Sequence, residues 1–416
     1  METNVKRINI FLSIIASVLI LTSCSTSKRD KSPTPVISFT PGITTLEPTA
    51  TPDITPTITI TPTPSPTPTP TPYYSATVNP NPTATPTPVP EDKRIVDPFR
   101  IYNSQTFEFD VKSLAKRYSD ILKVEVFGKS YMGKDLYVLK LGKGNTKFLI
   151  TGTTHARENI TTNYIMRTVE EYALAYLNSK KYDGYDVNKL LNEVTIYYVP
   201  LINPDGLDIV NLLKDPIDDP NNPVFGKVDE YTKVTWKANG RGVDLNKNYP
   251  FYFEDVQVIN PKQTYSSQDY HGPYAASEPE TYAMIKLCEE NDFQFCINLH
   301  CKGKVMFWRD VGNGVIEGDE KLAKLINKQT GYTMWTPTTS RLSYGGGHEN
   351  WFRHRFKKPA ICLELTAGND GPIPYNLINR EKFGDKLYDF YGSRVLDWDK
   401  TKSLALMLSQ EYFEIK

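Results

Sequence analysis

The chain has 416 residues, and its 48 acidic and 48 basic side chains give a formal net charge of zero. This balance lacks the basic excess typical of nucleic-acid-binding proteins, so we expect no nucleic-acid partner. Most of the prolines lie before residue 98, whereas apolar and aromatic residues are dispersed through the rest of the chain. The rest is long enough for one sizeable core and has no apolar run of membrane-spanning length.

The N-terminal residues 1–24 have the features of a targeting segment. Lys6 and Arg7 precede a largely apolar stretch from Ile8 to Leu21, and this stretch ends in Leu21-Thr-Ser-Cys24. The ending resembles the lipobox of bacterial lipoproteins, in which the cysteine is acylated and becomes the mature N-terminus. We therefore expect Cys24 to be lipidated and the chain to be extracytoplasmic and held at the membrane. An ordinary secretory peptide is the alternative.

Four more cysteines lie at positions 288, 296, 301 and 362. Their spacing contains no CxxC pair and leaves open whether they form disulfides.

Residues 25–97 form a low-complexity segment, with an unbroken Thr/Ser-Pro alternation from Thr61 to Pro72. Alternating prolines favour extended polyproline II and cannot build a core. At about 3.1 Å per residue, this segment reaches roughly 200 Å when stretched. We expect a disordered linker that reaches into the cell wall and carries a catalytic domain at residues 98–416.

From residue 98 onward, short apolar runs typical of buried strands alternate with segments of helical periodicity. The predicted strands are Phe148–Gly152, Val194–Ile202, Phe293–Leu299 and Ala360–Leu365. The predicted helices are Asn163–Leu177, Ser277–Glu290 and Leu322–Thr330, and Asn203-Pro-Asp-Gly206 predicts a turn. This alternation is typical of an α/β fold with a parallel or mixed sheet flanked by helices on both faces.

Polar clusters follow the ends of four predicted strands, where open α/β sheets bind their ligands. These clusters are His155 to Glu158, Asn203 to Gly206, His300 and Glu364. We expect them to share one rim of the sheet and to form an active site there.

Three of these side chains have the ligand chemistry of a catalytic zinc site. Two histidines and one glutamate with an open fourth position form such a site, and His155, Glu158 and His300 supply that set. The alternatives are a surface pair for His155 and Glu158 and a core histidine for His300. The water that zinc activates also needs a base, and Glu364 suits that role at the end of a buried strand. A structural ion pair is the alternative for Glu364.

The ordered motifs identify a family. The chain has His155-Ala-Arg-Glu158, Asn203-Pro-Asp-Gly206, Gly242-Val-Asp-Leu-Asn246, Ser277-Glu-Pro-Glu280, His300 and Glu364. This series, over about residues 100 to 395, resembles the M14 metallocarboxypeptidases of the carboxypeptidase A type. The resemblance implies a mixed eight-stranded sheet, one zinc ion held by His155, Glu158 and His300, and Glu364 as general base. It implies hydrolysis of peptide bonds.

Two positions depart from the family pattern. Family members have arginines where this chain has Lys237, which would steady the scissile carbonyl, and Lys247, which lies next to Asn246 in the site for the substrate carboxylate. Lysine keeps the charge but loses the planar fork that binds a carboxylate bidentately. Arg241, which is near both in sequence, is a candidate to supply a guanidinium.

Two further substrate contacts follow from the resemblance. Counting back from Trp351 places the family tyrosine at Leu342, so Tyr344 is the candidate, and the adjacent glycines let it reach inward. The same count places Glu349 at the base of the side-chain pocket, where an acidic residue selects a basic substrate side chain. We therefore expect cleavage before diaminopimelate or lysine. The alternatives are a packing tyrosine and a solvent-facing Glu349.

The run from Gly345 to Pro359 resembles the bacterial branch that includes γ-D-glutamyl-diaminopimelate endopeptidases. This resemblance implies peptidoglycan stem peptides as substrates. The alternative from another class is an inactive peptide- or cell-wall-binding module on the same fold, and a third is zinc-dependent deacylation of amino acids.

Overall fold

The computed structural model describes residues 93–216, 228–258, 264–310, 314–335, 345–366 and 397–415. The targeting segment with Cys24, the linker up to residue 92, and Tyr344 lie outside the described residues. Within the described ranges, no helix is both long and apolar enough to cross a membrane.

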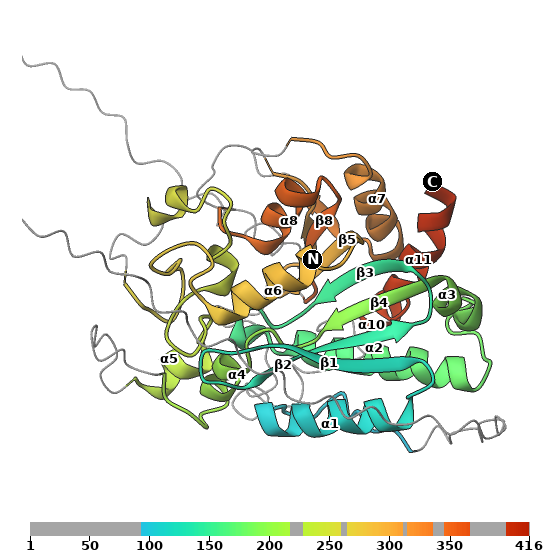
Figure 1. Cartoon of the computed structure of the whole chain (residues 1–416), viewed down its shortest axis with the longest axis horizontal. Coiled ribbons are helices and arrows are strands. Elements are labelled where there is room, and N and C mark those ends of the chain that lie inside the picture. The colour runs from blue at the N-terminus through green and yellow to red at the C-terminus, as the bar shows by residue number, and fades with distance from the viewer. Residues whose placement is uncertain are drawn as a thin grey trace, which may run out of the picture. The chain divides into compact units, whose positions relative to one another are not determined.

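One eight-stranded sheet forms the centre of the fold, with strand order β1-β2-β4-β3-β5-β8-β6-β7. Figure 1 shows β2, β4 and β3 side by side in this sheet. Strands β3, β4, β5 and β8 are mutually parallel, whereas β1 with β2, β2 with β4 and β6 with β8 pair antiparallel. The strands are β1 Leu122–Lys129, β2 Asp135–Gly142, β3 Thr146–Thr151, β4 Val194–Val199, β5 Phe293–His300, β6 Val305–Phe307, β7 Thr333–Trp335 and β8 Ala360–Glu364. The predicted mixed sheet is thereby confirmed.

Helices cover both faces of the sheet. One face packs against α1, α2, α3, α7, α10 and α11 through the larger apolar cluster, and the other packs against α6 and α8 through a second cluster. The helices are α1 Ser104–Arg117, α2 Ile160–Leu177, α3 Val187–Glu193, α4 Pro204–Val210, α5 Glu230–Val234, α6 Pro279–Glu289, α7 Asp319–Thr330, α8 His348–Phe356, α10 Trp398–Thr401 and α11 Leu404–Ile415. Three 3₁₀ turns, Ala156–Glu158, Leu245–Lys247 and Glu254–Val258, complete the described elements.

The motif Asn203-Pro-Asp-Gly206 begins a helix instead of forming an isolated turn. Asn203 is the N-cap of α4, and its Oδ1 accepts a hydrogen bond from the backbone N–H of Gly206 at 2.8 Å. Proline at the first helical position lacks the N–H that would be unpaired there. The residues that favour a turn also start a helix, which explains the difference from the prediction.

The packed domain begins slightly before residue 98. The backbone N–H groups of Ile95 and Val96 donate to the buried carboxylate of Glu170 in α2, and Val96 is buried. These residues from the end of the predicted linker therefore belong to the folded part.

The sheet brings the predicted polar clusters to one edge. Because β3, β4, β5 and β8 are parallel, their carboxyl ends point the same way. His155 follows β3, Asn203 follows β4, and His300 and Glu364 end β5 and β8 as a registered pair. The cysteines at positions 288, 296, 301 and 362 are buried free thiols.

Candidate active site

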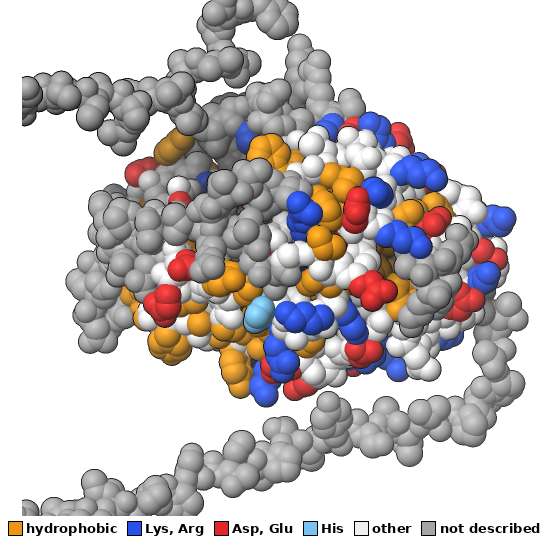
Figure 2. All heavy atoms as spheres, turned by 90° about the horizontal axis from the view of Figure 1, so that it is seen from above, with side chains coloured by type: hydrophobic (Ala, Val, Ile, Leu, Met, Phe, Trp, Pro, Cys, Tyr) orange, Lys and Arg blue, Asp and Glu red, His pale blue; other side chains and the backbone are white. Residues whose placement is uncertain are grey.

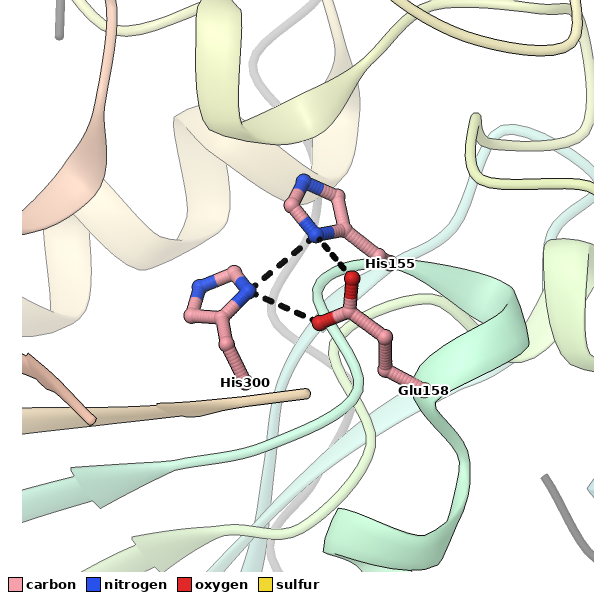
Figure 3. A group of neighbouring side chains, drawn as sticks. All are labelled: His155, Glu158 and His300. Carbon is pink, nitrogen blue, oxygen red and sulfur yellow. Dashed lines mark hydrogen bonds and ion pairs between the residues drawn. The ribbon is translucent and has the colours of Figure 1, made fainter. Parts of the chain in front are cut away.

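His155, Glu158 and His300 converge at this edge, as Figure 3 shows. Nδ1 of His155 lies 2.9 Å from Oε1 of Glu158, and Nδ1 of His300 lies 2.9 Å from Oε2 of the same carboxylate. The two Nδ1 atoms are 3.1 Å apart. All three side chains are buried, so the sheet edge holds three potential metal donors away from solvent.

Local backbone structure fixes these donors. Residues Ala156–Glu158 form a 3₁₀ turn directly after His155, and this turn brings Glu158 back to the same point as His155. The backbone N–H of Cys301 donates to Oε2 of Glu158 at 3.1 Å, which ties the carboxylate to the end of β5. The set is therefore held by backbone contacts as well as by side chains.

The protonation of His155 follows from Asp244. Nε2 of His155 lies 3.1 Å from Oδ1 of Asp244. Burial would raise the pKa of Asp244, but Lys237 and His155 hold it well below its usual range. An ionised carboxylate only accepts hydrogen bonds, so Nε2 of His155 carries a proton and Nδ1 is the ring nitrogen left to face the other two side chains. This nitrogen faces the carboxylate of Glu158 and Nδ1 of His300.

This arrangement fits a cation. Burial would raise the pKa of Glu158, but His155 and His300 lower it, so the carboxylate is ionised. Burial would lower the pKa of His300, and the hydrogen bond and charge of Glu158 raise it. Glu158 and His300 thus stabilise each other's charged forms. Two imidazoles and one carboxylate form the donor set of catalytic zinc sites, so the residues present fit zinc.

Asp244 and Lys237 extend the site. Nζ of Lys237 lies 3.1 Å from Oδ2 of Asp244, so the carboxylate bridges Lys237 and His155. Burial would lower the pKa of Lys237, but Asp244 and Glu158 raise it, which keeps the ammonium charged. Asp244 lies inside a motif that carries the family resemblance, but no role for it is predicted from the sequence alone. A carboxylate in the middle of that motif was the available signal.

Glu364 lies close enough to Glu158 and His300 for their charges to shift its pKa. Burial, and then the negative charge of Glu158, raise the pKa of Glu364, whereas His300 and Lys237 act in the opposite direction. Its Oε2 has no hydrogen-bond partner among the described residues. A carboxylate with a raised pKa and an uncommitted oxygen has the properties of a general base.

The structure describes the surroundings of Asn246 and Lys247, the two residues predicted to lie in the site for the substrate carboxylate. The backbone N–H of Asn246 donates to Asp244, and its Oδ1 accepts from the backbone N–H of His348 at 2.9 Å. Burial and the nearby Lys237 lower the pKa of Lys247. A Cβ on Gly346 would lie 2.1 Å from the carbonyl oxygen of Lys247, so only glycine allows this close approach.

Arg241 is engaged elsewhere. Its Nη2 and Nε bind the two oxygens of buried Glu278 at 2.6 and 2.9 Å, and its guanidinium lies over the ring of Tyr131. This bidentate ion pair uses the guanidinium N–H groups that a substrate carboxylate would need. Substrate binding by Arg241 stays a prediction, and the structure shows instead a link between Arg241 and the Ser277-Glu-Pro-Glu280 motif.

Glu349 is buried in the first turn of α8 and does not face solvent. Its Oε2 accepts a hydrogen bond from Nδ2 of Asn298 at 3.2 Å. Asn298 lies two residues before His300 on β5, so Glu349 packs against the strand that carries a candidate metal donor. Asn298 was not predicted as a site residue, because in the sequence it is one polar residue within an apolar run.

Comparisons with known proteins show which family the chain belongs to. Residues 109–370 match the family described as zinc carboxypeptidase, peptidase M14. The chain is 29% identical to γ-D-glutamyl-L-diamino acid endopeptidase 1 of Lysinibacillus sphaericus over 72% of this chain and 74% of that protein. It is 32% identical to carboxypeptidase B of Astacus astacus over 64% of this chain and 87% of that protein.

A solved structure shows the same fold. The structure of bovine thrombin-activatable fibrinolysis inhibitor, in complex with tick carboxypeptidase inhibitor, aligns with a TM-score of 0.56 and 18% identity. The alignment covers 76% of this chain and 99% of that one. The family match extends over more than half of the chain and includes both histidines and both glutamates of the site. The chain belongs to the peptidase M14 family of zinc carboxypeptidases.

Proposed function

We propose that this chain is an active zinc peptidase that binds one zinc ion through His155, Glu158 and His300 and cleaves peptidoglycan stem peptides. The observation that carries the activity is the convergence of these three donors within hydrogen-bond distance, with Glu364 paired in register beside His300. When bound, zinc polarises a carbonyl oxygen and lowers the pKa of water.

The side chains then perform the proton transfers. Glu364 takes a proton from the attacking water, whose oxygen bonds to the scissile carbonyl carbon. Glu364 returns this proton to the leaving nitrogen as the C–N bond breaks, so the base is regenerated. Lys237 stabilises the negative charge that develops on the carbonyl oxygen. Asp244 supports this step because it holds Lys237 and His155 in one hydrogen-bonded chain.

The proposed substrate class rests on the negative charge of Glu349 and on the similarity to a named relative. The Lysinibacillus sphaericus relative is named for a bond between γ-D-glutamate and an L-diamino acid. Buried Glu349 favours a substrate side chain that carries an amine. Both point to a stem peptide cleaved before diaminopimelate or lysine, with Asn246 and Lys247 attracting the substrate carboxylate and Tyr344 contacting the peptide.

We also propose that Cys24 carries a lipid and that residues 25 to about 92 tether the enzyme. This arrangement holds the catalytic domain outside the membrane and within reach of the cell wall. The substrate and the location are therefore mutually consistent.

Incubation of the full-length, zinc-loaded chain with defined stem peptides and ordinary peptides tests the proposal, with products identified by mass. The expected product is a stem peptide cut before its diamino acid. An inactive binding module on this fold would instead bind stem peptides and release no product.

A further inference from the structure

Asn298 lies where three strands and one helix meet. On β5 it pairs with Thr151 of β3 on one side and with Cys362 of β8 on the other. Its side chain is on the same face of β5 as that of His300, because residues two apart share a face. Asn298 is only 1% exposed, and Thr151 is fully buried. Its amide therefore depends on protein partners for all of its hydrogen bonds.

The orientation of this amide follows from Glu349. A carboxylate only accepts hydrogen bonds, so the nitrogen of Asn298 must face it, and Nδ2 donates to Oε2 of Glu349 at 3.2 Å. The amide oxygen then points the other way and accepts from Oγ1 of Thr151 at 2.8 Å and Sγ of Cys296 at 3.2 Å. A directed chain of hydrogen bonds thus runs from Thr151 through Asn298 to Glu349.

Glu349 is left incompletely paired by this chain. Among the described residues, its Oε1 has one long contact, to Nδ2 of Asn350 at 3.4 Å. Glu349 is 7% exposed, and its partner Asn298 lies two residues before His300 on β5, so Glu349 lies near the proposed active site. A buried carboxylate with a weakly bonded oxygen gains most from a hydrogen-bonded cation.

We infer that Asn298 is a positioning residue for substrate specificity: with Thr151 behind it, it fixes Oε2 of Glu349 so that Oε1 binds the amine of a substrate's diamino side chain. The inference rests on the proposed function, because it specifies how that site selects its substrate. Thr151 acts only through Asn298, and Asn298 acts only through Glu349.

The test compares two peptides that end in lysine and in norleucine, which has the same chain without the amine. The ratio of their kcat/KM values measures recognition of that amine. Asn298→Leu is expected to lower the lysine preference about tenfold, the effect of losing one hydrogen bond to a charged group. Thr151→Val preserves the shape of the side chain but removes its hydroxyl, and it is expected to lower the lysine preference less. Thr151→Ser keeps the hydroxyl and is expected to preserve the lysine preference.

A double-mutant comparison separates positioning from general damage. When Glu349 is already replaced by Gln, adding Asn298→Leu is expected to leave the lysine-to-norleucine ratio of kcat/KM unchanged. The reason is that Asn298 acts on this ratio only through the Glu349 carboxylate. Zinc content and melting temperature are measured for each variant. The inference would be overturned if Glu349→Gln lowers the lysine preference while Asn298→Leu and Thr151→Val both leave it unchanged. This outcome would leave the proposed function intact.

Calorimetric binding of free lysine and norleucine gives a readout without hydrolysis. Wild type is expected to bind lysine more tightly, and Asn298→Leu is expected to reduce the difference. If wild type cleaves no peptide but shows this pattern, the proposed activity fails and the positioning role stands. If wild type does not distinguish the two amino acids and cleaves both peptides equally, the positioning role is wrong.

Discussion

Asp244 holds His155 through a 3.1 Å contact between its Oδ1 and Nε2 of the imidazole, on the side of the ring opposite the metal donors. This contact places a proton on Nε2 and orients the ring so that Nδ1 faces Glu158 and His300. Carboxylates that orient a metal-binding histidine in this way typically contribute 10- to 100-fold to metal affinity.

Asp244→Asn is therefore expected to weaken zinc binding by about tenfold or more, because the amide keeps the size of the side chain but loses the charge. Competition with a chelator of known affinity measures this directly. Asp269→Asn is a matched control, because Asp269 also approaches Lys237, at 3.9 Å, but does not contact His155. Equal zinc affinity in wild type and Asp244→Asn would contradict this role.

Replacing both imidazoles tests the donor set itself. His155→Ala combined with His300→Ala leaves Glu158 as the single remaining donor, which is too few for a stable zinc site. Metal analysis of the purified chain is expected to give about one zinc per wild-type molecule and almost none for the double mutant. Near-stoichiometric zinc in the double mutant would place the metal elsewhere.

Glu280 predicts a pH dependence of stability. Burial, with the charges of Asp205 and Glu278, raises its pKa to about 8, compared with about 4.3 in an unfolded chain. Between these values the folded state binds more protons than the unfolded state, so this group's contribution lowers the free energy of unfolding as pH rises from about 4.3 to about 8.

Glu280→Gln does not titrate and is expected to lose less stability between pH 5 and pH 8 than wild type. Urea unfolding at both pH values, with zinc held constant, measures the difference. The exposed Glu290 at the end of the same helix provides a control, Glu290→Gln, which is expected to follow wild type. A parallel pH dependence for Glu280→Gln and wild type would contradict the protonation of Glu280 in the folded state.

Membrane attachment is predicted to depend on Cys24. In the native host, Cys24→Ala removes the thiol that would be acylated, so the protein should leave the detergent-extracted membrane fraction. Cys288→Ala serves as a control, because Cys288 is a buried thiol in the folded domain. Full membrane partitioning of Cys24→Ala would show that another segment holds the chain.

The position of these residues at one edge of the sheet was predictable, because each candidate metal donor and Glu364 follows an apolar run with a clear strand pattern. Parallel strands deliver their carboxyl ends to one edge, so order along the chain was enough to place these residues together. Contacts that depend on tertiary packing were not predictable. Asp244 contacts His155, 89 residues earlier in the chain, and Asn298 contacts Glu349, 51 residues later, and nothing in their local sequence indicates these partners.

The same limit applies to Arg241. Its position between Lys237 and Lys247 suggested a substrate contact, whereas the folded chain binds its guanidinium to Glu278. Glu278 lies 37 residues further along the chain, so the pairing arises only from the tertiary fold.

The most direct test of the account is the turnover of Glu364→Gln, measured on a preparation whose zinc content is known. The variant is expected to fold, to bind about one zinc, and to lose about 10²- to 10⁴-fold in kcat on a verified peptide, because the amide cannot take up the proton. Near wild-type turnover with zinc in place would contradict the assignment of Glu364 as the general base and, with it, the proposed mechanism.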